Sequence, residues 1–226
     1  MLEDMRKDRL DIIYEDKNII VINKPTNLLT IGTKDEKINT LYHKVHEYLY
    51  KKNKNNKVFI IHRLDKDTSG IVVFAKSSRI KELYQTRWNN LAETREYIAV
   101  VEGVMPKKKD RIKEYLAETK TLLTYATTKD KGKLAVTNYE VMEQHKNHAI
   151  LKITIETGRK NQIRVCLANL NHPIIGDKKY GAKQNPLRRV CLHASRLVLL
   201  DPETNEKREF TAKIPSQFKI FYENNK

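Results

Sequence analysis

The stretch VFIIHRLDKDTSGIVVFAKS, residues 58–77, decides the fold, because two short apolar runs enclose a polar turn. Residues 58–61 and 71–75 are rich in β-branched side chains and predict two strands. The turn carries polar side chains at His62, Arg63, Asp65, Lys66, Asp67, Thr68 and Ser69. Loops held on a rigid scaffold often carry reactive groups, so we interpret this turn as a candidate site around the Asp65 carboxylate. The alternative is an ordinary turn with a capping Asp.

Further strands and helices are expected on both sides of this segment. The apolar residues 19–22 predict a buried strand within residues 11–23. Other strands are expected at residues 97–101, 135–144, 148–157, 196–200 and 208–213, and helices at 40–50, 77–92 and 160–170. Residues 145–147 would turn a long hairpin, and residues 51–57 and 106–110 would be polar loops.

The order of these elements predicts the fold class. Successive strands without helices between them imply an α+β fold, with a mixed, largely antiparallel sheet and helices packed on it. A length of 226 residues suits one large domain or two small ones, and no repeat or change of composition marks a boundary. We therefore predict a single domain over residues 1–226, with a core at about residues 11–218.

Charge is the most informative feature of the composition. Lys and Arg number 44 against 28 for Asp and Glu, a formal net charge of +16, which favours a polyanion such as nucleic acid as partner. A basic amphipathic membrane helix is the rival, but no segment joins a strong apolar face to a basic one. A Lys-heavy composition can also be a property of the genome, so charge is only supporting evidence.

We expect a cytoplasmic protein without a membrane partner. No apolar run reaches the roughly 18 residues that span a bilayer. The first residues, MLEDMRKDRLDIIYED, place charges where a signal peptide has its apolar stretch. Cys166 and Cys191 form no C-x-x-C pair and are expected to line the core, as in a reducing compartment.

A second polar concentration lies at residues 157–181, TGRKNQIRVCLANLNHPIIGDKKYG. Gly158 can break the chain after the hairpin, and Arg159, Lys160, Gln162 and Arg164 then crowd the start of a helix. A helix N-terminus with added cations is an anion site. The alternative is a solvated cationic helix face, which is the more common case for a run of charges.

These two segments resemble motifs of the RluA-type pseudouridine synthases, RNA-modifying enzymes. HRLDKDTSG, residues 62–70, is similar to the family's catalytic motif, and TGRKNQIRV and HPIIGDKKYG to its third motif and the loop after it. Collinear matches are YEDKNIIVINKP at 14–25, REYIAVVEG at 95–103, CLHASRL at 191–197 and DPETNEKREFTAKIP at 201–215. The resemblance covers about residues 14–218 and implies the pseudouridine synthase catalytic fold, here without the small N-terminal RNA-binding domain that many relatives carry.

The chain departs from the family pattern at a few positions. The family often has Thr-His where Lys160-Asn161 stand, a His near Cys166, and Gly at Asn171. We interpret these as variation in substrate contact or packing. The residues that the resemblance expects to act on the base are present.

The resemblance implies a role for each site residue. The reaction detaches uracil from ribose, turns it, and rejoins it through carbon 5, so no cofactor is expected. Asp65 would be the catalytic carboxylate, as nucleophile or base, Arg164 its ion-pair partner, and Tyr97 would stack on the uracil. Arg63 would fill the space left by the flipped base, and Ile163 would wall the pocket. The remaining expected substrate contacts are His62, Leu64, Arg159, Lys160 and Gln162.

The expected partner is RNA, either ribosomal or transfer RNA, bound by a monomer. Tyr97 could instead be a plain core residue, and Asp67 is better interpreted as a turn residue bonding its own backbone. His62 would be structural or contact RNA rather than act as a general base.

Three other functions fit the sequence less well. A nonenzymatic RNA-binding protein would not need Asp65. A nuclease needs clustered carboxylates for divalent metal, but cations flank Asp65 and Asp67. A glycosidase needs a second carboxylate, and none stands out. No metal site is expected either, because the pairs His43/His46 and His145/His148 have no evident third ligand.

Overall fold

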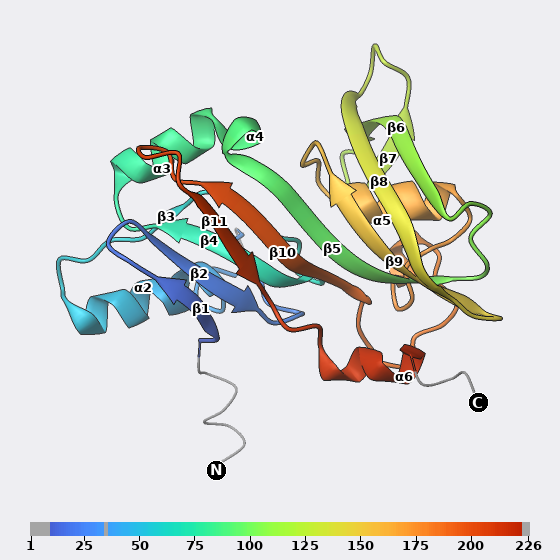
Figure 1. Ribbon diagram of the computed structural model, residues 1–226, viewed down its shortest axis with the longest axis horizontal. Helices are drawn as coiled ribbons and strands as arrows, with labels where there is room; N and C mark the ends of the chain where they lie inside the picture. Colours follow the sequence, from blue (N-terminus) through green and yellow to red (C-terminus); the bar gives the residue numbers. More distant parts are fainter. Residues whose placement is uncertain (1–9, 34–35, 223–226) are drawn as a thin grey trace. The chain divides into compact units, whose positions relative to one another are not determined.

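The computed structural model describes residues 10–33 and 36–222 (Figure 1). By its contacts the chain divides into two compact units. The first runs to Ala92 and includes Val198–Ala212, and the second comprises Glu93–Leu197 and the residues from Lys213 onward. The N-terminal residues 1–9, part of the stretch weighed as a signal peptide, lie outside the described residues.

The first unit is built on two buried strands, β2 (Ile19–Lys24) and β4 (Ser69–Ala75), which pair antiparallel. Each contains a continuous apolar run, residues 19–22 and 71–75, rather than an alternating one, which is the pattern of strands covered on both faces. The remaining strands of the unit are β1 (Ile12–Glu15) beside β2, β3 (Phe59–Ile60) beside β4, and β11 (Lys207–Thr211).

The helices of the first unit are α2 (Leu41–Lys52), α3 (Ser78–Thr86) and the short α4 (Trp88–Leu91). Thr40 caps α2, because its Oγ1 accepts a hydrogen bond from the His43 amide at 3.1 Å. The helix buries Leu41, Val45 and Leu49, which are spaced four residues apart and so share one face.

Five strands of the second unit follow one another across the sheet in the order β5 (Ala92–Glu102), β9 (His148–Ile155), β8 (Lys133–Gln144), β6 (Lys109–Glu118) and β7 (Thr124–Thr127). Each neighbouring pair is antiparallel. The other elements of the second unit are α5 (Gln162–Asn169), η1 (Lys178–Tyr180), η2 (Ser216–Phe218), α6 (Lys219–Tyr222) and the part of strand β10 (Leu192–Leu200) that runs to Leu197.

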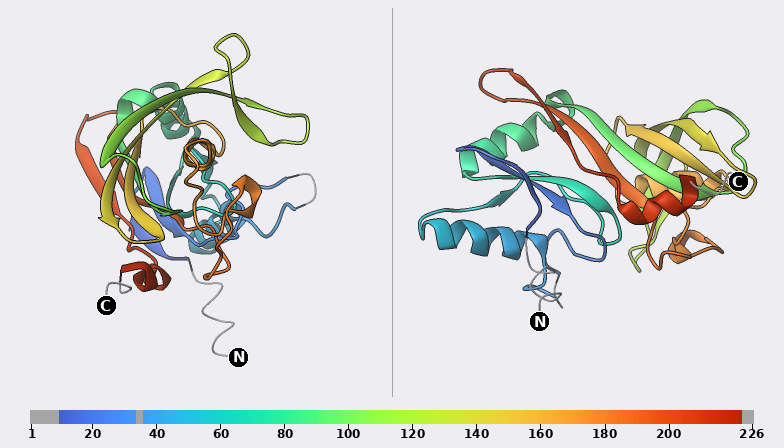
Figure 2. Two further views of the ribbon diagram at one scale, coloured as in Figure 1. Left: turned by 90° about the vertical axis from the view of Figure 1, so that its right-hand side faces the viewer. Right: turned by 60° about the horizontal axis from the view of Figure 1, so that its bottom comes forward.

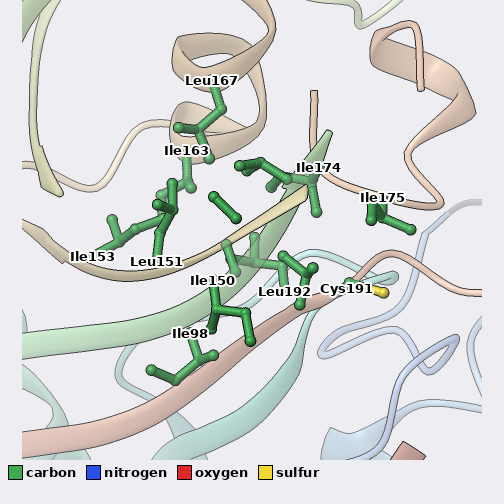
Figure 3. Close-up of a cluster of buried hydrophobic side chains, with 14 of the residues drawn as sticks. Ile98, Ile150, Leu151, Ile153, Ile163, Leu167, Ile174, Ile175, Cys191 and Leu192 are labelled. Atoms are coloured by element: carbon green, nitrogen blue, oxygen red, sulfur yellow. The ribbon is translucent and has the colours of Figure 1, made fainter. Parts of the chain in front are cut away.

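Helix α5 contacts β6, β7 and β8, and its buried side chains complete the core of the second unit (Figure 3). Ile163 and Leu167 project from the helix toward Leu151 and Ile174, which come from β9 and the segment after the helix. The burial of these two apolar side chains holds α5 in place, and it therefore also holds the polar residues at the start of the helix.

The predicted α+β class with a largely antiparallel sheet is confirmed. Helix 40–50, the hairpin turning at 145–147, and strands near 71–75, 97–101, 196–200 and 208–213 are present. No helix among the described residues is long and apolar enough to cross a membrane. The division into two units describes contacts, and it does not test whether the chain folds as one domain. The single domain over residues 1–226 therefore stays a prediction.

Several predicted bounds were wrong. Residues 11–23 form two strands instead of one, because Asp16 Oδ1 accepts from the amides of Asn18 and Ile19, both at 2.7 Å, and turns the chain. The helix expected over 77–92 breaks at Arg87. The loop expected at 51–57 begins only after Lys52, and β6 already begins at Lys109, inside the loop expected at 106–110.

Candidate active site

The predicted catalytic turn lies between β3 and β4 of the first unit. His62 and Asp65 are half-buried, Arg63 is exposed, and Leu64 is buried with 8% of its surface accessible. Strand β4 follows directly and is buried along its whole length. The C-terminal end of the turn is therefore anchored by the buried strand β4.

Two threonines hold the backbone of this turn. Thr30 Oγ1 donates to the Leu64 carbonyl at 2.7 Å and accepts from the Leu64 amide at 3.2 Å. Thr26 Oγ1 donates to the Asp67 carbonyl at 2.8 Å, and the Thr68 amide donates to the Asp65 carbonyl at 3.2 Å. The peptide groups on both sides of Asp65 are thus fixed, which limits the positions that its side chain can reach.

Lys24 adds a third anchor at the end of β2. Its side chain is fully buried, and Nζ donates to the carbonyls of Leu28 at 2.8 Å, Pro25 at 2.9 Å and Lys66 at 3.1 Å. A buried ammonium needs such acceptors because it has lost its water. Lys24 therefore joins segment 25–28 to the residue that follows Asp65.

His62 has structural contacts. Its Nε2 accepts a hydrogen bond from the Val73 amide at 3.1 Å, and its ring stacks on Trp88 at 4.7 Å between centroids. An Nε2 that accepts is unprotonated, and it already serves the backbone of β4. This favours the structural role over a general base, and a contact of His62 to RNA stays a prediction.

The other predicted site residues belong to the second unit. Tyr97 is half-buried in β5, opposite Ile153 of β9. Arg95 points to the same face of β5 and is 8% exposed, with Nη2 donating to the Glu156 carbonyl at 2.6 Å. Burial lowers the pKa of the Arg95 guanidinium, and the nearby Tyr97 opposes this. Tyr97 thus stands beside a buried cation.

Gln162 fixes the start of α5. Its Oε1 accepts from Thr157 Oγ1 at 2.8 Å and from the Arg159 amide at 3.0 Å. Its Nε2 donates to the Val136 carbonyl at 3.0 Å and to Thr137 Oγ1 at 3.1 Å. The amide is fully used within the protein, so Gln162 shapes the turn before the helix, whereas contact with substrate stays a prediction.

Arg164 is held by Asp177 in a bidentate ion pair. The guanidinium Nε and Nη2 lie 2.6 Å and 2.7 Å from the two Asp177 carboxylate oxygens, and the side chains are 4% and 0% exposed. Nη1 donates to Asn161 Oδ1 at 3.2 Å. The Tyr180 ring packs on the guanidinium at 5.3 Å, and its hydroxyl accepts from Asn161 Nδ2 at 3.0 Å.

We call Arg164, Asp177, Asn161 and Tyr180 the arginine clamp. Asn161 adopts a left-handed conformation with φ of 52°, which asparagine tolerates better than most residues. It therefore suits this position, where the family often has His. The predicted ion pair of Arg164 with Asp65, which belongs to the other unit, stays a prediction.

The remaining predicted residues surround this clamp. Ile163 is 5% exposed and packs in the core, so its role as a pocket wall stays a prediction. Arg159 is exposed, with Nε donating to the Leu134 carbonyl at 2.9 Å. Lys160 Nζ pairs with Glu118 at 2.6 Å. These two cations lie at the start of α5 as expected.

Sequence reasoning assigned no role to Lys24, Thr30 or Asp177. Lys24 and Asp177 do lie in quoted motifs, NKP at 23–25 and GDKKYG at 176–181, which was the available signal. Thr30 had none. Among residues 10–33 and 36–222, no group of three or more His, Cys, Asp or Glu side chains could hold a metal ion.

Comparison with known proteins defines the class of this chain. The sequence model of the family described as RNA pseudouridylate synthase matches residues 18–169, a stretch that includes the Asp65 turn and α5. The chain is therefore an enzyme, an isomerase of the pseudouridine synthase class.

Curated relatives narrow this further. The chain is 34% identical over 223 residues to ribosomal large subunit pseudouridine synthase D of Haemophilus influenzae, covering 92% of this chain and 68% of that protein. It is 33% identical over 212 residues to an uncharacterized RNA pseudouridine synthase of Bacillus subtilis, covering 93% and 70%. The chain belongs to the RluA-type pseudouridine synthase family.

A solved structure shares the fold. Human RNA pseudouridylate synthase domain containing 4 superimposes with a TM-score of 0.77 at 23% identity, over 92% of this chain and 90% of that one. The predicted pseudouridine synthase catalytic fold is thereby confirmed.

Proposed function

We propose that this enzyme isomerises specific uridines of ribosomal or transfer RNA, using the Asp65 carboxylate and no metal, nucleotide or redox cofactor. The observation that carries the proposal is the anchored turn, in which Thr30, Thr26 and Lys24 fix the backbone on both sides of Asp65. A preorganised carboxylate is what either proposed chemistry requires.

The chemistry balances without any further reactant. The bond between N1 of uracil and C1′ of ribose breaks, and a bond between C5 and C1′ forms. The proton leaves C5, and N1 ends protonated, so nothing is oxidised and no group is lost. An ionised Asp65 can attack as a nucleophile or accept a proton as a base, and both roles are open.

Tyr97 and Arg164 are proposed to complete the site. Tyr97 would stack on the uracil, and Arg164 would keep Asp65 ionised and aimed. The arginine clamp supports this role because three hydrogen bonds within its own unit, two to Asp177 and one to Asn161, fix the Arg164 guanidinium.

Ribosomal RNA of the large subunit is the first substrate to test, because several relatives are named for it. Transfer RNA is the second. We place the enzyme in the cytoplasm and expect it to act as a monomer.

The test replaces Asp65 by Asn, which keeps the size and removes the charge. RNA transcribed with uridine tritiated at C5 releases tritium when pseudouridine forms. We expect Asp65→Asn to abolish release while affinity for the RNA stays within a few-fold, since phosphates are bound by other residues. Asp67→Asn, two positions along the same turn, is the matched control and should retain turnover.

Measurable turnover by Asp65→Asn would remove Asp65 from the central role. If both Asn variants release tritium at the wild-type rate, the activity comes from a contaminating enzyme. That result would favour a nonenzymatic RNA-binding role for this protein. Mapping pseudouridines in RNA from cells with and without the gene then names the uridine.

A further inference from the structure

The turn between β6 and β7, residues 119–123, is closed by four hydrogen bonds. The Thr119 amide donates to the Leu123 carbonyl at 2.8 Å, and the Leu122 amide donates to the Thr119 carbonyl at 2.9 Å. Thr119 Oγ1 accepts from the Leu123 amide at 3.1 Å and lies 2.8 Å from Thr121 Oγ1. This turn therefore holds one defined shape.

Its tip presents Leu122 in an unfavourable way. The residue has a φ of 62°, in the left-handed region that bulky side chains rarely adopt, and 61% of its surface is exposed. Asn or Gly would suit both the backbone and the solvent better. Since folding gains nothing evident from a leucine here, its presence points to a function outside the fold.

Lysines lie in this turn and in the segment that contacts it. Lys120 lies in the turn and is exposed, and Lys179 Nζ donates to the Leu122 carbonyl at 3.5 Å. Lys178 beside it is exposed, and Lys183 follows in the next loop. Lys120, Lys178 and Lys183 form no ion pair within residues 10–33 and 36–222. Their charge is available to an anionic partner.

The tip is also continuous with the arginine clamp. Lys179 and Tyr180 are neighbours in η1, so the same short helix contacts Leu122 on one side and Arg164 on the other. Figure 2 shows the turns at the two ends of β7 projecting away from α5. The position of this turn is therefore tied through η1 to the start of α5.

We infer that Leu122 is an apolar wedge for RNA, inserted beside a base near the target uridine while Lys120 and Lys178 hold phosphates. Apolar side chains inserted at base steps unstack them, and unstacking a neighbour lowers the cost of extruding the target base. Leu122 and the neighbouring Leu123, which is 38% exposed, form a small apolar tip with exposed lysines beside it. Such a tip fits a polyanion with stacked bases better than a protein partner, whose interface would need a broader apolar surface. The inference rests on the proposed activity on RNA.

The decisive variant is Leu122→Gly, which removes the wedge and relieves the backbone. We expect an unchanged or higher Tm, a KM for large-subunit ribosomal RNA raised about tenfold, and an unchanged kcat at saturating RNA. Leu122→Met keeps an apolar tip and should keep most of the affinity. Ile38→Ala is the matched control, because Ile38 is 69% exposed in the first unit and should leave KM unchanged.

The lysines are tested through salt. For single-stranded sites, each lost phosphate contact reduces the slope of log Kd against log salt by about 0.7. Lys120→Met and Lys178→Met should each reduce the slope by this amount, and each variant should retain turnover at saturating RNA.

Each outcome decides the matter. An unchanged KM for Leu122→Gly, or a lower Tm with RNA binding intact, would overturn the wedge. A change in oligomeric state with unchanged KM would identify the tip as a contact between copies and overturn it too. A wild-type enzyme that releases no tritium would instead sink the proposed function, so the two failures are distinguishable.

Discussion

The buried Asp177 complicates any test of Arg164, because a substitution of Arg164 changes stability as well as catalysis. It is 0% exposed and holds two nitrogens of Arg164, itself 4% exposed. Removing one partner of a buried ion pair costs roughly 3–5 kcal/mol, because the other charge is left without compensation. Arg164→Met would therefore destabilise the fold whatever Arg164 does in catalysis.

A double variant separates the two effects. We expect Arg164→Met to lower the free energy of unfolding by roughly 3–5 kcal/mol, and Arg164→Met with Asp177→Asn to recover part of that loss, because Asn leaves no buried charge. If Arg164 pairs with Asp65, the folded double variant should still show collapsed turnover, with RNA affinity nearly intact. Urea unfolding and single-turnover kinetics at saturating RNA measure the two quantities.

Arg159→Met is the control for a residue that only grips phosphate. Arg159 is exposed and donates to a single carbonyl, so its loss should weaken RNA binding and spare turnover at saturation. Normal turnover by the double variant, with affinity lost in the manner of Arg159→Met, would contradict the ion-pair role of Arg164.

At the scale of elements, Glu15 ties β1 to its neighbours. Its Oε2 accepts from Tyr48 and Lys52 of α2, both at 2.9 Å, and its Oε1 accepts from Lys76 after β4 at 2.7 Å. Burial alone would raise the pKa of Glu15, but the hydrogen bonds from Lys76, Lys52 and Tyr48 outweigh it and lower the pKa to about 2.

This shift predicts a pH dependence with a definite sign. A carboxylate whose folded pKa lies below its unfolded value of about 4.3 stabilises the fold at higher pH and stops doing so as pH falls toward about 2. Glu15→Gln should cost about 1 kcal/mol at pH 6, a figure discounted for partial exposure. The difference from wild type should shrink to less than about half by pH 3.

Urea unfolding of both proteins between pH 6 and pH 3 measures that difference. Glu82→Gln, at an exposed position of α3, is the control and should differ little from wild type throughout. A Glu15→Gln deficit that stays constant down to pH 3 would show that the carboxylate charge is not what links these elements.

The elements also show which parts of the fold a single sequence can predict. Strands β2 and β4 were evident because each contains a buried, unbroken apolar run, residues 19–22 in β2 and 71–75 in β4. β6 and β7 were missed: they expose much of their surface, and β7 has one neighbouring strand, so few apolar residues mark them. A break such as the one at Arg87 has no Gly or Pro to signal it.

In the candidate site, too, some residues could be predicted from the sequence and others could not. The Asp65 turn and the start of α5 could each be found from the sequence, because the polar residues of each lie in one short continuous segment. Their supports come from far along the chain, as with Lys24 and Lys66, which are 42 residues apart, or Thr30 and Leu64, which are 34 apart. Only folding brings such pairs together, and neither partner carries a local pattern that names the other.

At the scale of the whole molecule, charge is the dominant property. The excess of 44 basic over 28 acidic residues leaves +16, and acidic residues such as Glu140 and Glu156 are already engaged with Lys109, Lys152 and Arg111. Hydrogen bonds from these partners lower the pKa of Glu140 and of Glu156 to about 2, so the pairs persist at neutral pH. Exposed cations such as Lys120 and Lys178 are available to RNA.

The charge predicts that binding and catalysis respond differently to salt. Affinity for RNA should fall steeply, since a protein that contacts 6–10 phosphates of a duplex loses about 10³–10⁵-fold between about 50 and 200 mM salt. Single-turnover rates at saturating RNA should change little, because the carboxylate chemistry releases no counterions. Asp65→Asn should show the wild-type slope, whereas Lys120→Met should show a shallower one. Filter binding and tritium release over this salt range measure both quantities. A shallow wild-type slope would mean that the cations face solvent and that RNA is held mainly by uncharged contacts.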